Sequence, residues 1–307
     1  MRMERSNLRV IAITGGTGLL GRELTKHFGE TGMWNVAPLD RAEVDVTDPG
    51  GVDRTIARLK PDTIVNCAVI LDVDRCEADP EACFSVNRDG VKNLLTAAGK
   101  LEKPPTFVQI GSSEIFGRVK PGEYRIHGYR ESDEPKPVSS YQRSKKEAED
   151  ALTSFVARNP NTLKHWYIAR AGWLYGEGQP TFVDRFATLL QSKEPLTVIK
   201  DQWRSPTWTR DFARSLASVL ENNLTSGVYH LTAEVKHGEA TTMDVIEEIE
   251  RHLGKKSARP KITFTTQAKF FKVPRAPSNV LLNTKLPKLP YWRDSLAEYL
   301  REKYPSL

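Results

Sequence analysis

The sequence predicts an α/β protein with a doubly wound parallel sheet and a smaller C-terminal lobe. Two observations carry this prediction. Short β-rich apolar runs alternate with segments of helical periodicity through the first half of the chain, which is the pattern of strand–helix–strand units with right-handed crossovers. A glycine-rich turn over residues 14–21 separates the first apolar run from the first helical segment. Ligands of such sheets bind at the carboxyl ends of the strands.

The expected elements follow one another in a regular cycle. Residues 8–13 are β-rich, and Leu20, Leu24 and Phe28 recur at helical spacing after the glycines. Further strands are expected at 34–40, 63–68, 106–110 and 165–170, and further helices near 50–59, near 80–100 and around Tyr141. Beyond residue 171 the pattern loosens, but we expect a helix over 209–222 and a strand over 227–232 to return to the main sheet.

The glycine motif has a defined chemical use. Glycines at these positions permit a tight turn, let the backbone approach a pyrophosphate and let the helix pack closely on the strand, while the helix N-terminus supplies donors. The spacing of three and three residues is the form found in extended short-chain dehydrogenases/reductases, which have the Rossmann fold. The cofactor contacts predicted in this turn are Gly15, Thr17, Gly18, Leu19, Leu20 and Gly21.

The residues after the second strand bear on the choice of cofactor. Asp40 ends that strand about 20 residues after the glycines, where an acid binds the adenosine ribose. Arg41 follows it directly and is suited to a 2′-phosphate. The pair therefore leaves both NAD(H) and NADP(H) open. Asp45 and Val46 are expected to line the adenine.

The cofactor site divides the chain into two lobes. We expect a dinucleotide-binding domain made of residues 8–172 plus the returning segment 208–232. Residues 173–207 and 233–307 are expected to form a substrate-binding lobe over the cofactor.

Bulk properties exclude several classes of protein. The chain of 307 residues has 39% apolar and 27% charged residues, which is ordinary for a globular protein. No apolar run approaches the ~20 residues of a membrane span, and residues 1–7 lack the apolar stretch of a secretory signal. We therefore expect a cytoplasmic protein without a membrane partner. The net charge of +6 suits an anionic ligand such as a nucleotide, and the scattered basic residues do not indicate nucleic acid. A homodimer is compatible with the sequence, which does not define the oligomeric state.

Three cysteines, Cys67, Cys76 and Cys83, occur without a Cys-x-x-Cys pair or clustered histidines. Neither a disulfide framework nor a metal site is therefore indicated. Reduced thiols are the expectation for such a protein.

Tyr141 and Lys145 lie four residues apart on a predicted helix. This spacing places a phenol and an ammonium on one face, where the positive charge is expected to lower the pKa of the tyrosine toward neutrality. Such a tyrosine is a general acid or base at physiological pH. Together with the glycine turn, the pair indicates a redox enzyme.

Segments spread over nearly the whole chain resemble dTDP-4-dehydrorhamnose reductases. They are residues 45–48, 59–68, 170–176, 201–207, 277–284 and 291–296. The resemblance implies NADPH- or NADH-dependent reduction of the 4-keto group of a nucleotide-bound 6-deoxy sugar. It also implies that Ser112 takes the place of the family's catalytic threonine or serine, that Tyr141 is the proton donor and that Lys145 is its partner. Two hydroxyl donors beside a ketone stabilise the negative charge that hydride transfer creates.

The same resemblance assigns further residues. Cys67 and Ala68 match small residues that run under the cofactor, and Val73 and Trp173 match positions that contact the sugar. Asn87 matches a helix asparagine with a structural role. The sequence departs from the family at Ala276, where the family usually has an arginine suited to the phosphates of the sugar nucleotide. Arg275 beside it and Arg204 are candidates to take over that contact, because a guanidinium binds two oxygens at once.

Two alternatives remain open. At Ser113 and Glu114 the reductase pattern has Asp and Tyr, and the Ser-Glu pair resembles GDP-mannose 4,6-dehydratases, whose glutamate is the acid/base. Ser113 and Glu114 are thus expected to face the sugar, either as binding residues or in a dehydratase or epimerase that uses Glu114. Residues 203–207 also resemble the regulatory β subunit of methionine adenosyltransferase, which implies a non-catalytic dinucleotide-binding subunit.

Overall fold

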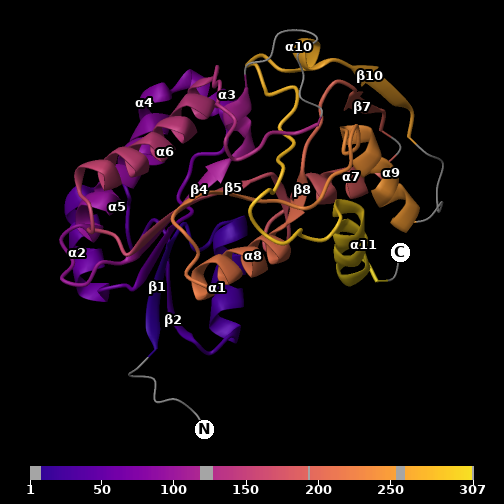
Figure 1. The fold of residues 1–307 in the computed structure, drawn as a ribbon. Helices are drawn as coiled ribbons and strands as arrows, with labels where there is room; N and C mark the ends of the chain where they lie inside the picture. Colours follow the sequence, from indigo (N-terminus) through magenta and orange to yellow (C-terminus); the bar gives the residue numbers. More distant parts are fainter. Residues whose placement is uncertain (1–7, 118–126, 193, 254–259, 306–307) are drawn as a thin grey trace.

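The structure, a computed structural model, describes residues 8–117, 127–192, 194–253 and 260–305 (Figure 1). Strands and helices alternate through the first half of the chain. They are β1 (Arg9–Thr14), α1 (Leu19–Glu30), β2 (Trp34–Leu39), α2 (Pro49–Leu59), β3 (Thr63–Asn66), α3 (Val73–Ala78), α4 (Pro80–Phe84), α5 (Gly90–Ala98), β4 (Thr106–Ser112), α6 (Ser140–Arg158) and β5 (His165–Ala171).

The second half begins with short strands. Its elements are β6 (Trp173–Tyr175), α7 (Phe182–Gln191), β7 (Leu196–Ile199), β8 (Pro206–Trp208), α8 (Thr209–Glu221), β9 (Gly227–Leu231), α9 (Thr242–Leu253), β10 (Ile262–Thr265), α10 (Gln267–Phe270) and α11 (Trp292–Lys303). Within the described residues one parallel sheet has the order β2-β1-β3-β4-β5-β9. β9 therefore lies beside β5, at the edge opposite β2.

Helices cover both faces of this sheet, which explains why its strands are apolar on both sides. Because side chains alternate along a strand, Ile11 and Ile13 of β1 pack with α1 and α8 on one face. Ala12 packs on the other face with residues of α2, α5 and α6. Figure 1 shows these two groups of helices on opposite sides of the sheet.

One helix differs from its prediction. The helical run expected near 80–100 is interrupted by a π-helical turn, Ser85–Asp89, between α4 and α5. Such a turn carries one extra residue per turn and frequently occurs at functional sites. The turn packs against α6, where Asn87 contacts Ser144.

A separate apolar core lies beyond the main sheet. It includes Tyr175, Trp208, Ile246 and Leu296, which come from β6, β8, α9 and α11. Two parallel ribbons, β6 with β8 and β7 with β10, accompany this core. In the parts of the chain that the structure describes, no helix has the length and apolar character needed to cross a membrane.

Candidate active site

The carboxyl edge of the sheet brings together segments that are far apart in the sequence. The glycine turn follows β1, Cys67 and Ala68 follow β3, and Ser112 ends β4. Because β1, β3 and β4 are neighbours in the sheet, these three segments lie side by side. α6 begins next to them, since the phenol of its second residue, Tyr141, lies close enough to Ser112 for Ser112 to act on it.

The glycine turn leaves no space for side chains at two positions. Gly15 has a φ of +62°, and a Cβ there would lie 2.9 Å from the carbonyl carbon of Cys67. A Cβ on Gly21 would lie 2.2 Å from the carbonyl oxygen of Gly15. Gly18 is the N-cap of α1 and receives no side-chain cap, so the N–H groups of the first helical turn remain as donors for an anion. This geometry fits the pyrophosphate of a dinucleotide.

The other residues of the turn differ in exposure. Thr17 is exposed, and its carbonyl oxygen accepts a hydrogen bond from Arg22 Nε at 2.6 Å. Leu19 and Leu20 open α1, and Leu20 packs into the core. Leu20 therefore anchors the turn, while Thr17 and Leu19 lie nearer the surface.

The residues predicted to bind the adenosine half of the cofactor hydrogen-bond and pair with one another. Asp40 accepts a hydrogen bond from the N–H of Ala42 at 2.7 Å, so its carboxylate folds back on the turn. The exposed Arg41 pairs with Asp45 through Nε and Oδ2 at 3.0 Å. Val46 is buried in the core. A polar rim beside β2 is thus formed by Asp40, Arg41 and Asp45. It holds both an acid and an arginine, so it favours neither NAD nor NADP.

Tyr141 is held in place by the start of α6. Ser139 and Gln142 form a capping box, in which the Gln142 N–H donates to Ser139 Oγ at 3.4 Å and the Ser139 N–H donates to Gln142 Oε1 at 3.2 Å. This arrangement satisfies donors that the first helical turn leaves open. Tyr141 is only 4% exposed, and Ser112 lies close enough to act on its phenol. The two predicted catalytic hydroxyls therefore meet at the carboxyl end of β4.

The predicted effect of Lys145 on Tyr141 is wrong. Burial raises the pKa of Tyr141 to about 12, and the negative charge of Glu114 adds to this rise, while the hydrogen bond with Ser112 opposes it. Lys145 is one turn further along α6, but its Nζ donates to the carbonyl oxygen of Ile110 at 2.7 Å. Burial is the largest cause of both shifts, because removing either ion from water is costly.

Sequence reasoning missed the buried charges behind Lys145. Burial lowers the pKa of Lys145 to about 8, and Glu149 opposes that shift. Glu149 forms a buried ion pair with Arg170 of β5 at 2.8 Å. Arg170 in turn lies 3.2 Å from Nε2 of His230 on β9. These residues come from three separate elements, so no local spacing in the sequence marks them as a group.

The expectation of three reduced thiols is wrong for two of them. Cys76 of α3 and Cys83 of α4 form a disulfide with their Cα atoms 5.1 Å apart. The two short helices follow one another directly, which brings together cysteines whose spacing matches no redox or metal motif. Cys67 remains free, and burial raises its pKa to about 12. A thiol in this state packs under the glycine turn and is a poor nucleophile.

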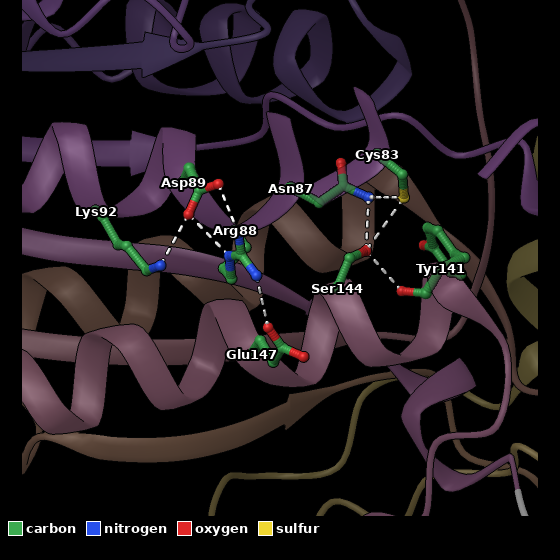
Figure 2. A network of polar contacts seen from close by, with 8 residues as sticks. All are labelled: Cys83, Asn87, Arg88, Asp89, Lys92, Tyr141, Ser144 and Glu147. Atoms are coloured by element: carbon green, nitrogen blue, oxygen red, sulfur yellow. Dashed lines mark hydrogen bonds and ion pairs between the residues drawn. The ribbon is translucent and has the colours of Figure 1, made fainter. Parts of the chain in front are cut away.

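A polar network connects the π-helical turn to the start of α6 (Figure 2). Asn87 accepts from the N–H of Ile70 at 2.7 Å and donates to the carbonyl oxygen of Ile70 at 3.1 Å. Its amide also donates to Ser144 Oγ at 3.0 Å, and Ser144 donates to the carbonyl oxygen of Tyr141 at 2.8 Å. Asn87 therefore supports Tyr141 from behind and fixes the loop after β3.

The predicted sugar-binding residues form a second polar cluster. Arg204 Nη1 lies 3.2 Å from Glu114 Oε1, and the guanidinium of Arg204 lies 4.9 Å from the ring centroid of Trp173. Arg275 pairs with Asp74 at 2.8 Å, and its charge also acts on the phenol of Tyr141. The structure thus brings Glu114, Arg204 and Arg275 toward the catalytic pair.

The remaining predicted contacts are more enclosed. Val73 begins α3 and packs against the cluster of Cys76, Cys83 and Tyr141. Ser113 is 2% exposed, so its side chain is buried beneath the site. Among residues 8–117, 127–192, 194–253 and 260–305, no group of three or more His, Cys, Asp or Glu side chains is arranged to hold a metal ion.

Comparisons with known proteins agree with the geometry. The family model described as the RmlD substrate binding domain matches residues 9–304. A dTDP-4-dehydrorhamnose reductase of Streptomyces griseus is 32% identical over 93% of this chain and 91% of its own length. A crystal structure of such a reductase ortholog from Clostridium acetobutylicum is 31% identical, with a TM-score of 0.82 over 96% of this chain and 99% of that one. The Bacillus anthracis enzyme in complex with NADP has a TM-score of 0.83 over 96% and 99% of the two chains, but at 22% identity it shows the fold alone.

The tightness of the glycine turn predicts the effect of substituting Gly21. The variant Gly21→Ala places a methyl group against backbone, and overpacking of this kind costs about 1–3 kcal/mol of unfolding free energy. We expect the displaced turn also to lose dinucleotide binding. The matched control is Gly29→Ala in the same helix, where an added Cβ meets nothing within 4 Å and a gain of up to about 1 kcal/mol is expected. Urea unfolding and NADPH fluorescence measure both effects, and equal behaviour of the two variants would contradict the prediction.

The lowered pKa of Lys145 predicts a specific pH dependence of stability. Above about pH 8 the native lysine releases its proton, whereas an unfolded lysine keeps it until about pH 10.4. The unfolded state then binds more protons, so native stability rises with pH across this window, on the order of 1 kcal/mol per unit. Urea unfolding of the wild type and of Lys145→Met gives the difference curve. That curve should rise between these two pKa values, and a flat curve would show that the lysine titrates normally.

Proposed function

The chain belongs to the dTDP-4-dehydrorhamnose reductase family, and we propose that it reduces the 4-keto group of a nucleotide-bound 6-deoxy sugar with NADPH or NADH. It is then an NAD(P)-dependent oxidoreductase. The observation that carries the proposal is the proximity of Ser112 to the buried phenol of Tyr141, on which it acts, at the sheet edge where the glycine turn follows β1. The Streptomyces griseus relative is named for this reaction.

The two hydroxyls suit the charge that the reaction creates. The bound nicotinamide supplies the hydride, and the carbonyl oxygen of the sugar then develops negative charge. Ser112 and Tyr141 both donate toward that oxygen, and such donors are most effective in a site that excludes water. A phenol with a raised pKa still protonates an alkoxide, because an alkoxide is a much stronger base than a phenolate. In this proposal Tyr141 therefore ends the reaction as the proton donor.

In the same reaction Lys145 would bind the cofactor. Its Nζ is 2.7 Å from the carbonyl oxygen of Ile110, which leaves further ammonium protons for the ribose hydroxyls of the nicotinamide half. Cofactor hydroxyls would add hydrogen bonds to the charged form of this lysine, and such bonds raise its pKa again. Binding of the cofactor would thus restore the positive charge beside Tyr141.

Substrate contacts are proposed for the polar cluster above the catalytic pair. Nη1 of Arg275 is a buried donor without a hydrogen-bond partner in the described part of the chain. It suits the diphosphate of a sugar nucleotide, for which a planar guanidinium is a good match. The ring of Trp173 stacks on Phe182 and lies under the guanidinium of Arg204, so Trp173 would serve the sugar site by holding Arg204 in place. We accordingly assign the sugar to the segments 173–207 and 233–307.

Location and assembly are part of the same proposal. A cytoplasmic enzyme would have access to nucleotide sugars and reduced dinucleotides. A homodimer is the assembly that we propose to test by sedimentation. The reaction assigned above requires only residues of one chain.

The role of Tyr141 is tested by Tyr141→Phe. We expect loss of at least 100-fold in the rate of ketone reduction, within the range typical of general acid catalysis, with unchanged dinucleotide affinity. The matched control is Tyr167→Phe, whose phenol bonds to the carbonyl oxygen of Leu224 and which should remain active. Absorbance of NADPH with a dTDP-4-keto-6-deoxy sugar measures the rate. Reduction by Tyr141→Phe at the wild-type rate would remove the proposed proton donor.

The same absorbance assay, run with product analysis on a panel of nucleotide sugars that includes hexoses with an intact C6 hydroxyl, separates the alternatives. Net oxidation of NADPH that matches the amount of product identifies a reductase. Product formed without net oxidation of the cofactor identifies a dehydratase or an epimerase. Tight dinucleotide binding with no turnover on any nucleotide sugar identifies a regulatory subunit.

A further inference from the structure

Glu114 occupies a position that joins the catalytic pair to the sugar-binding segments. It lies in the 3-10 turn Ser113–Phe116, immediately after Ser112. Its backbone N–H donates to Ser112 Oγ at 3.2 Å, so the same residue orients the catalytic hydroxyl. Its side chain reaches in the other direction, toward Arg204 and Asn279.

Four donors from three parts of the chain surround the Glu114 carboxylate. Asn279 Nδ2 and Arg204 Nη1 donate to Oε1 at 2.7 and 3.2 Å. Gln142 Nε2 and the N–H of Ala276 donate to Oε2 at 3.4 Å each. A carboxylate has about four acceptor sites, so these contacts occupy both oxygens. Such a carboxylate has little capacity left to remove a proton from a substrate.

We propose that Glu114 is a positioning residue, whose carboxylate holds Arg204 and Asn279 so that together they receive one hydroxyl of the hexose. This inference rests on the proposed function for the identity of the sugar. It assigns Asn279, which sequence reasoning did not single out, to the substrate site. It also moves Arg204 from the phosphates to the sugar.

Two buried atoms mark the place of that hydroxyl. Nε of Arg204 and Oδ1 of Asn279 have no hydrogen-bond partner among the described residues. Because Asn279 must turn its amino group to Glu114, its carbonyl oxygen is left as an acceptor, and Arg204 Nε is left as a donor. A sugar hydroxyl both donates and accepts, so it can satisfy both atoms, whereas a phosphate oxygen would meet the lone pairs of Oδ1.

The backbone holds the two side chains in register. The N–H of Asn279 donates to the carbonyl oxygen of Trp203 at 3.1 Å, and the N–H of Trp203 donates to the carbonyl oxygen of Pro277 at 3.0 Å. Arg204 follows Trp203 directly, and its guanidinium lies over the ring of Trp173. Its positive charge is offset by Glu114, so Arg204 presents a directed donor to the ligand. The unpartnered donor for the diphosphate is then on Arg275.

The test exchanges the carboxylate and the amide. In Glu114→Gln the contacts with Arg204 and Asn279 are disrupted, and we expect KM for the keto sugar nucleotide to rise about tenfold with kcat changed less than about threefold. The double variant Glu114→Gln with Asn279→Asp restores one carboxylate and one amide in the pair, and it should bring KM back to within about threefold of the wild type. An acid/base at position 114 predicts the opposite: loss of kcat at constant KM, and no rescue by the exchange.

A titration of Tyr141 provides a second readout. Burial raises the pKa of Tyr141 and the charge of Glu114 adds to the rise, whereas Ser112 and Arg275 oppose it. Glu114→Gln should therefore lower the pKa of Tyr141, which the ultraviolet absorbance of the phenolate measures by difference from Tyr141→Phe. Glu302→Gln, which alters an exposed partner of Arg210, is the matched control and should leave KM and the titration unchanged. An unchanged titration of Tyr141 in Glu114→Gln would contradict the placement of the Glu114 carboxylate on which the inference rests.

The design separates this inference from the proposed function. Turnover of the wild type tests the reaction, whereas the exchange tests Glu114. If the wild type reduces no keto sugar, calorimetric titration with dTDP-glucose replaces KM. Weakening by Glu114→Gln and recovery in the double variant then support the positioning role independently of the reaction. Unchanged affinity in Glu114→Gln, with retained NADPH binding as evidence of folding, would overturn it.

Discussion

The hydrogen bond from Lys145 Nζ to the carbonyl oxygen of Ile110 is the contact on which the geometry of the site depends. It connects the interior of α6 to the last residues of β4, and both partners are buried. Breaking it would leave a buried ammonium and a buried carbonyl unpaired, which costs more than the bond itself contributes. The bond therefore fixes the rotation of α6. One turn earlier on the same face, Tyr141 then meets Ser112 at the end of that strand.

Burial is the largest cause of the pKa shifts of both Tyr141 and Lys145. The pKa of Tyr141 rises to about 12 and that of Lys145 falls to about 8, so both shifts favour the neutral form. The spacing of four residues correctly predicted a shared helical face. It gave the wrong direction for the tyrosine, because desolvation depends on segments that the local sequence does not contain. Glu149, paired with Arg170, partly restores the charged state of the lysine from behind.

Features that depend on local spacing could be predicted from the sequence, whereas features that depend on distant segments could not. Leu20, Leu24 and Phe28 recur on one face of α1 and pack together as expected, because helical periodicity is a local property. The disulfide between Cys76 and Cys83 and the π-helical turn beside it were missed. Both arise where short helices pack against α6, through contacts such as that between Asn87 and Ser144, which are 57 residues apart. The family resemblance supplied the catalytic positions that we propose, but it did not indicate which groups surround them.

Reductases and dehydratases of nucleotide sugars share this sheet and a Ser/Thr, Tyr and Lys set, so neither feature distinguishes the two reactions. What distinguishes them is the access of a carboxylate to the sugar. A proton acceptor needs an oxygen that faces the substrate without a competing donor, because each hydrogen bond to a carboxylate stabilises its charged form and weakens it as a base. Both oxygens of Glu114 already accept hydrogen bonds, from Arg204 and Asn279 on one side and from Gln142 and Ala276 on the other. In the proposed reaction a glutamate in this environment shapes the site through its neighbours, and the chemistry is assigned to Tyr141 and Ser112.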